Sequence, residues 1–167
     1  MRLKKEMFLK PFEIRWSDVD ANAHLANSAY INFMSHTRVS FFETYGFSMR
    51  TLNLHKIGPV LFYEHVHYFK ESYLGMKINV SLELSGLSED GMFFMFEHNF
   101  FDDKGKNLAQ CEVMGSWIDL KSRKLVPLPE QLLTQFKTIP KSDTFKILTK
   151  ADTRKYARAP KDIKLPQ

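Results

Sequence analysis

A cluster of polar side chains lies near the N-terminus, directly before the one long helical pattern in the sequence. Its members are two carboxylates, two amides and an imidazole: Asp18, Asp20, Asn22, Asn27 and His24. The first N–H groups of a helix have no intrahelical partner and carry the positive end of the helix dipole, so they favour developing negative charge. This order of residues predicts a chemical site at a helix start.

The helix predicted behind the cluster has about 18 residues, judged from its periodicity. One face recurs at steps of three and four: Ala26, Tyr30, Phe33, Thr37, Phe41 and Tyr45. Asn27 or Ser28 suits the N-cap, because a short polar side chain can accept a hydrogen bond from a free N–H of the first turn. Gly46 is placed to end the helix, since glycine takes the left-handed conformation without a Cβ clash.

The rest of the chain consists mostly of strand patterns. Alternation of apolar and polar residues predicts strands over residues 8–16, 60–70, 77–87, 92–101 and 107–119. An irregular link that contains Gly58-Pro59 is expected between the long helix and the second strand, and turns are expected at residues 89–91 and 103–105. A short helix is expected over residues 129–136, with Pro at its first position, and no regular pattern follows Pro140. This order predicts an α+β fold in which one long central helix packs on an antiparallel β-sheet. Several strands are apolar on both faces, so we expect a second subunit to cover the surplus.

Length and charge limit the class of protein. With 167 residues and 44% hydrophobic residues, the chain can form one domain. Residues 138–167 hold 8 of the 24 Lys and Arg but only 3 of the 19 Asp and Glu, so this extension carries the whole net charge of +5. No nucleic-acid motif accompanies it, and we expect a solvated appendage and no nucleic-acid partner. A weaker alternative is that the extension meets the phosphates of a cofactor-like substrate.

Cysteine content and hydropathy indicate the compartment. The single Cys cannot form an internal disulfide, which favours a reducing environment. No apolar run is long enough for a signal peptide or a membrane span. We therefore expect a cytoplasmic protein.

Residues 18–30, with the sequence DVDANAHLANSAY, and Arg38 eight residues later resemble the N-terminal signature of hotdog-fold acyl-CoA thioesterases of the 4-hydroxybenzoyl-CoA thioesterase type. Gly75 resembles the family's turn into its third strand, whereas Glu71 stands where relatives commonly have Pro. The resemblance implies a hotdog domain over residues 1–137, followed by the basic extension. It also implies a homodimer or homotetramer, with the site between the long helix of one subunit and the sheet of its neighbour.

The resemblance also implies roles for three residues of the cluster. Asp20 matches the catalytic carboxylate, which acts as nucleophile on the thioester carbonyl or as general base on water. Asn27 matches the position whose backbone N–H polarises that carbonyl, in keeping with the charge at a helix start. His24 would orient the carboxylate or the water. From the residues alone, Asp20 could equally cap a turn, and His24 could be a packed structural residue.

Glu64 is a further candidate for proton transfer. It lies between Phe62 and Val66 on one face of its strand, and an apolar setting would raise its pKa. Its alternative role is an ion pair with Arg or Lys, and Arg38 is expected to be a structural ion-pair partner. Many relatives carry a Glu three residues before the helix Arg, where this chain has Ser35, so one candidate acid is missing.

Metal or thiol chemistry is not expected. His65 and His67 share one face of a strand at positions i and i+2, but no third ligand is fixed near them. Cys111 lies on an apolar strand face and should be buried and unreactive. We therefore expect no metal and no cofactor, apart from the CoA that forms part of the substrate.

The combined prediction is an acyl-CoA thioesterase that hydrolyses an acyl thioester, on CoA or an acyl carrier, to a carboxylic acid and the free thiol. Two alternatives remain. A non-catalytic acyl-thioester binding protein is compatible with the missing helix Glu. A hotdog enoyl-CoA hydratase would have an Asp, an Asn two residues on and a His five residues on; here His24 lies one residue early relative to Asp20 and Asn22.

Overall fold

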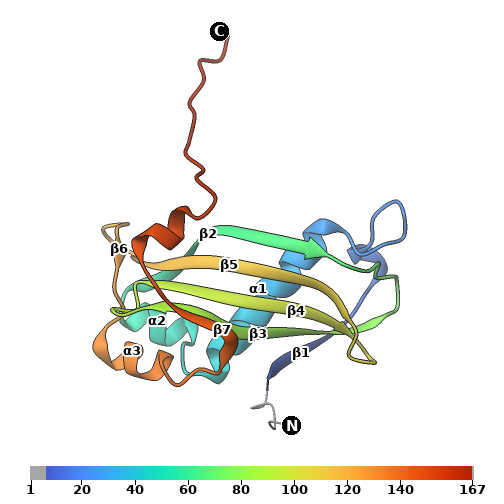
Figure 1. Ribbon diagram of the computed structural model, residues 1–167, viewed down its shortest axis with the longest axis horizontal. Coiled ribbons are helices and arrows are strands. Elements are labelled where there is room, and N and C mark those ends of the chain that lie inside the picture. Colours follow the sequence, from blue (N-terminus) through green and yellow to red (C-terminus); the bar gives the residue numbers. More distant parts are fainter. Residues whose placement is uncertain (1–6, 167) are drawn as a thin grey trace.

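Helix α1 (Asn27–Thr44) crosses one face of a β-sheet (Figure 1). In this computed structural model, which describes residues 7–166, the helix has the predicted length of 18 residues. The predicted stripe faces the core, and Gly46 ends the helix with φ +83°. The N-cap prediction is wrong, because Ala26 is the N-cap and makes no side-chain cap. Asn27 is instead the first helical residue, which leaves its N–H in the unpaired first turn.

Within residues 7–166, seven strands form the sheet. They are β1 (Phe8–Glu13), β2 (Ile57–Tyr68), β3 (Lys77–Ser88), β4 (Phe93–Asp102), β5 (Asn107–Asp119), β6 (Leu125–Val126) and β7 (Lys141–Leu148). The main order is β1-β3-β4-β5-β2, with every neighbouring pair antiparallel, while β6 pairs with β5 and β7 runs parallel to β3. The predicted meander of β3, β4 and β5 is confirmed, and so is the α+β hotdog architecture of one central helix on an antiparallel sheet.

Several element boundaries differ from the predictions. The first strand ends at Glu13, and a 3₁₀ turn, η1 (Trp16–Asp18), follows it. The expected irregular link contains helix α2 (Met49–Leu54), which begins where Ser48 Oγ accepts the N–H of Thr51. Gly58-Pro59 lies inside β2, because an edge strand tolerates a residue that cannot donate. Helix α3 (Glu130–Phe136) confirms the second predicted helix, although its Pro is the N-cap.

The core lies between α1 and the sheet and is rich in aromatic side chains. Phe41, Phe96, Trp117 and Phe136 are fully buried there, and Cys111 is buried as expected. Gly115 allows close packing in this region, since a Cβ there would lie 2.5 Å from a ring carbon of Phe94 and 2.7 Å from the carbonyl oxygen of Val60. The helix that begins at the polar cluster therefore packs on the sheet through a closely packed aromatic core.

The C-terminal extension is partly ordered, contrary to the prediction of no regular structure beyond Pro140. Strand β7 runs beside β3, and a second 3₁₀ turn, η2 (Lys150–Arg154), follows it. Leu148, at the end of β7, packs with Met95 and Met114 in a small cluster of its own. Part of the apolar surface that we assigned to a second subunit is thus covered by the chain itself.

Replacing Leu148 with Ala should lower the free energy of unfolding by about 2–4 kcal/mol, because a buried Leu loses its contacts and leaves a cavity. The side chain is only 3% exposed, and a urea titration measures the loss. Ile147 is the matched control: it is 58% exposed, so Ile147→Ala should change the stability by less than about 0.5 kcal/mol. Equal effects of the two variants would mean that β7 does not dock as described.

Candidate functional site

Asp18 anchors the loop that leads to helix α1. Its carboxylate accepts hydrogen bonds from the backbone N–H and the guanidinium of Arg15 at 2.9 to 3.1 Å. These bonds hold the pKa of the buried Asp18 carboxyl below its ordinary value. The Asp18 carbonyl also accepts the N–H of Ala26, the helix N-cap, at 2.9 Å. Asp18 is therefore a structural residue that fixes the loop before the helix.

Asp20 lies at the exposed tip of the same loop. Its Oδ1 accepts the N–H groups of Asn22 at 2.8 Å and His24 at 3.2 Å, and Ala23 between them has φ +60°. The turn-capping role that the sequence left open is therefore present. Oδ2 makes no hydrogen bond within the described residues, so capping uses only one oxygen. The loop fixes the orientation of the carboxylate and leaves the other oxygen available for chemistry.

His24 is oriented by residues that lie far away in the sequence. Its Nε2 lies 3.7 Å from Oε1 of Glu71, and its ring packs edge-on against Tyr73 at 5.1 Å. The hydroxyl of Tyr73 donates to Glu71, and this bond raises the pKa of Tyr73. Sequence reasoning gave Glu71 no chemical role. Its one signal was its position in the turn before the third strand, and only the fold shows that this turn meets the Asp20 loop.

Three of the four predicted residues, Asp20, His24 and Asn27, line one open hollow of about 310 Å³. Its opposite wall is formed by residues 68–72 and by Tyr30 of helix α1. Ser72 holds the two walls together, because its carbonyl accepts the N–H of Leu25 at 2.8 Å. A carboxylate and the first turn of a helix thus border the same space, as the chemistry of the cluster requires.

Glu64 does not line this hollow within the chain. Its Oε1 lies 2.9 Å from Nη2 of Arg38, and the same guanidinium donates to Ser35 Oγ at 3.0 Å. The contact with Arg38 lacks hydrogen-bond geometry, so Oε1 is buried without a hydrogen bond among the described residues. Glu64 therefore forms the ion pair that was its alternative role, and Arg38 is its partner. The expected apolar setting contains a guanidinium instead.

His98 completes the buried network around Arg38. Its Nδ1 lies 2.8 Å from the carbonyl oxygen of Ser81, and its Nε2 lies 3.4 Å from Nη1 of Arg38. The ring is fully buried, and burial together with the Arg38 charge lowers its pKa to about 3. The neutral ring therefore donates from Nδ1 to Ser81 and presents a lone pair to the guanidinium.

This network should make the protein less stable in mild acid. Below pH 6.5 the unfolded chain protonates His98, whereas the folded chain resists protonation down to about pH 3. The unfolded state therefore binds the extra proton, and His98 should cost about 1.4 kcal/mol of unfolding free energy per pH unit as the pH falls through that range. Urea titrations of the parent protein and of His98→Gln at several pH values measure the difference. Parallel stability curves would contradict the assignment.

His65 and His67 are the residues to consider as metal ligands, because they share one face of a strand. The rings of His65 and His67 stack at 4.7 Å, and Nδ1 of His65 lies 2.5 Å from the hydroxyl of Tyr156. Residues 7–166 contain no group of three His, Cys, Asp or Glu side chains arranged to hold a metal ion. Within the same residues no helix is long and apolar enough to cross a membrane.

Comparison with known proteins identifies the family. Residues 14–136 match the model of the thioesterase-like superfamily. A hypothetical protein of Staphylococcus aureus, solved in complex with CoA, is similar in structure with a TM-score of 0.75, 20% identity and coverage of 97% of each chain.

Two further structures share the fold. A 1,4-dihydroxy-2-naphthoyl-CoA thioesterase from Synechocystis has a TM-score of 0.69 and 16% identity, with coverage of 79% of this chain and 96% of that one. A probable thioesterase from Escherichia coli has a TM-score of 0.71 and 20% identity, with coverage of 81% of this chain and 100% of that one. No curated protein sequence matches. The chain belongs to the thioesterase-like superfamily.

Proposed function

We propose that the protein hydrolyses acyl-CoA thioesters in the hollow between the Asp20 loop and the start of helix α1. The observation that carries this proposal is the position of the Asp20 carboxylate beside the unpaired first turn of the helix, in one open space. Hydrolysis of a thioester requires a nucleophile or base that acts on the carbonyl carbon. It also requires a positive group, such as a helix dipole end, that stabilises the charge on the carbonyl oxygen. No cofactor takes part, because CoA enters as a portion of the substrate.

In the proposed reaction the thioester carbonyl points to the N–H of Asn27. Asp20 either removes a proton from a water that attacks the carbonyl carbon, or attacks that carbon itself to form an anhydride that water then opens. In both routes negative charge develops on the carbonyl oxygen, where the helix start stabilises it, and the carbon–sulfur bond breaks as the intermediate collapses. His24, held by Glu71, would orient the carboxylate or the water.

We further propose that two chains associate through strand β2. This strand pairs with β5 on one side, and along its other edge the sheet order ends. Beside this edge lie three large, exposed side chains: Leu61, Tyr68 and Phe69. An edge of this kind is a template for pairing with another strand. Antiparallel pairing of two β2 strands would bring the Asp20 hollow of one subunit near Leu61 and Glu64 of its partner. Light scattering should therefore give at least a dimer.

A thiol-release assay over acyl-CoAs of increasing chain length tests the reaction. The proposal expects release from at least one chain length, with saturation in substrate. Absence of release from every acyl-CoA and acyl-carrier thioester, together with binding of the same compounds, would favour a non-catalytic acyl-thioester binding protein. Hydration of a 2-enoyl thioester without thiol release would identify a hydratase instead.

A further inference from the structure

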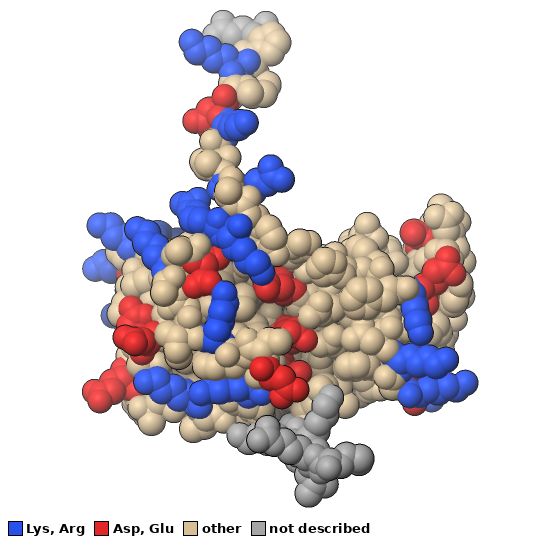
Figure 2. Space-filling model, viewed as in Figure 1, with Lys and Arg blue, Asp and Glu red and all other residues tan. Residues whose placement is uncertain are grey.

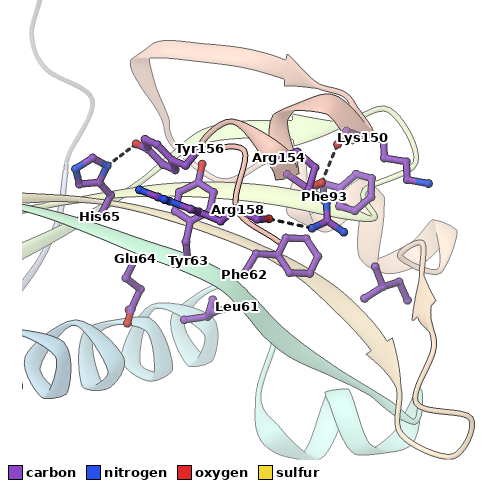
Figure 3. Close-up of a pocket in the computed structure, with 12 residues that line it drawn as sticks. Leu61, Phe62, Tyr63, Glu64, His65, Phe93, Lys150, Arg154, Tyr156 and Arg158 are labelled. Carbon is purple, nitrogen blue, oxygen red and sulfur yellow. Dashed lines mark hydrogen bonds between the residues drawn. The ribbon is translucent and has the colours of Figure 1, made fainter. Parts of the chain in front are cut away.

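The C-terminal extension and strand β2 enclose a second and larger cavity, of about 660 Å³. Figure 3 shows that Lys150, Arg154, Tyr156 and Arg158 lie on one side of β2, whereas Glu64 points to the other side, toward helix α1. Apolar side chains complete the wall: Phe62, Phe93 and Leu125. The cavity therefore combines a basic side with an aromatic side.

Specific contacts hold the basic side in place. Nζ of Lys155 lies 3.0 Å from both carboxylate oxygens of Glu112, on strand β5. The ring of Tyr156 packs edge-on against Tyr63 at 5.0 Å, and its hydroxyl meets His65. The contacts of the extension with the sheet therefore determine the positions of the neighbouring cations.

The cations of the cavity are not neutralised by the protein. Of the basic residues in this part of the extension, Lys146 pairs with Asp152 and Lys155 pairs with Glu112. Lys150, Arg154 and Arg158 take part in no ion pair among residues 7–166. Among the described residues, the one carboxylate that lines the cavity is Glu64, which is already paired with Arg38. Figure 2 shows the resulting concentration of Lys and Arg where the extension leaves the body of the molecule.

The aromatic side is exposed and shaped by a strand irregularity. The register of β2 against β5 shifts between Leu61 and Tyr63, which leaves Phe62 without a partner in a bulge. Bulges commonly turn a side chain toward a site. The Phe62 ring is 40% exposed and lies 6.3 Å from the ring of Phe93. Two rings next to guanidinium groups that form no ion pair among residues 7–166 suit a ligand that joins an aromatic base to phosphates.

We propose that this cavity binds the phosphorylated nucleotide half of a CoA thioester, with Arg154 and Arg158 on the phosphates and Phe62 beside the base. The inference rests on the proposed function and extends it from the acyl end to the carrier end of the substrate. The volume lies within the usual range of ligand sites, about 300–1,000 Å³. Leu61 and Tyr68 are about 23 Å apart along β2, at 3.3 Å per residue. In the proposed antiparallel dimer, Leu61 of one subunit would lie beside the Tyr68 end of the partner's β2. The cavity of one subunit would then lie nearer to the partner's Asp20 hollow than to the Asp20 hollow of its own chain.

Adenosine 3′,5′-bisphosphate, which carries the base and phosphates without the thioester, tests the site directly by calorimetry. The double variant Arg154→Gln/Arg158→Gln should bind it at least about tenfold more weakly, because two charged hydrogen-bond donors are lost. Lys161→Gln, which removes a cation of the same extension outside the cavity, is the matched control and should bind normally. The double variant should also show a raised KM for octanoyl-CoA, an unchanged kcat, and an unchanged KM for octanoyl-pantetheine.

The outcomes separate this proposal from the proposed function. Binding of the bisphosphate that depends on Arg154 and Arg158, without hydrolysis of any thioester, would support the site and refute the reaction. Hydrolysis with no bisphosphate binding, or with equal binding by parent and double variant, would overturn the site alone. Loss of activity confined to octanoyl-acyl carrier protein would assign these arginines to a carrier protein and would also overturn the nucleotide proposal.

Discussion

Asp20→Asn is expected to lower kcat for thioester hydrolysis by about 10²- to 10⁴-fold, the usual contribution of a positioned base. The reason is specific to this loop. An Asn side chain keeps an oxygen that can accept the N–H groups of Asn22 and His24, so the turn survives while the carboxylate charge is lost. Steady-state kinetics over a series of acyl-CoAs measures the effect, and a urea titration should show unchanged stability.

Asp18 provides the matched control for this experiment. It lies two residues earlier, but its carboxylate is committed to Arg15. Asp18→Asn should therefore cost about 1 kcal/mol of unfolding free energy and leave kcat within about twofold. If Asp20→Asn retains full thiol release, Asp20 is only a turn cap and the proposed mechanism is wrong. If Asp18→Asn is the inactive variant, the catalytic carboxylate is Asp18 and not Asp20.

Arg38→Met should destabilise the protein by about 3–5 kcal/mol, because it leaves the Glu64 charge buried without a partner. Nη2 of Arg38 is the group 2.9 Å from Glu64, and Nη1 is the group beside His98. The double variant Arg38→Met/Glu64→Leu should recover much of the loss, since it removes both charges. Chemical denaturation of the parent, the two single variants and the double variant gives the coupling energy.

One further variant, Glu64→Gln, decides whether Glu64 has any part in catalysis. Glu64→Gln keeps the shape of the side chain and removes its charge. If Glu64 only neutralises Arg38, this variant should lose stability but keep kcat within about twofold once folded. A large fall in kcat at unchanged stability would restore Glu64 as a proton-transfer group, supplied across the dimer to the partner's hollow. Additive effects of Arg38→Met and Glu64→Leu would contradict the ion pair.

The cavity on the extension gives the protein a basic surface away from the hollow. The hollow itself is bordered by one lysine, Lys70, and by the carboxylates of Asp20 and Glu71. Phosphates would gain little there, because the carboxylates repel them. Phosphates bound by the cations beside η2 would not meet this repulsion. The division between a catalytic hollow and a distant phosphate site would explain why the net charge of the chain is concentrated in residues 138–167.

Local pattern was sufficient to predict most of the fold. The i, i+3, i+4 stripe from Ala26 to Tyr45 gave helix α1 its correct length, because burial against a sheet needs one apolar face. Strict alternation in β3 and β5 placed these strands within one residue of their observed bounds. Strand β7 was missed because it is mostly exposed and polar, with a single buried anchor at Leu148. Short edge strands of that kind carry no periodic signal.

The candidate site was predictable to the extent that it is local. Asp20, His24 and Asn27 lie within eight consecutive positions, so any turn that begins a helix brings them together. Glu71 was not recognisable as their neighbour, because its approach to His24 depends on the path of the chain between β2 and β3. Glu64 was misplaced for the same reason: its strand neighbours are apolar, but its actual partner, Arg38, comes from the helix beneath.

The sequence by itself determined the helix, the meander and the polar loop at the helix start, since these depend on contacts between residues close along the chain. The tertiary structure decided which charges meet. It paired Glu64 with Arg38, set Glu71 against His24, and docked the extension so that Arg154 and Arg158 border a cavity with Phe62. Electrostatic partners act through space at distances of a few ångströms, and only the folded chain fixes those distances.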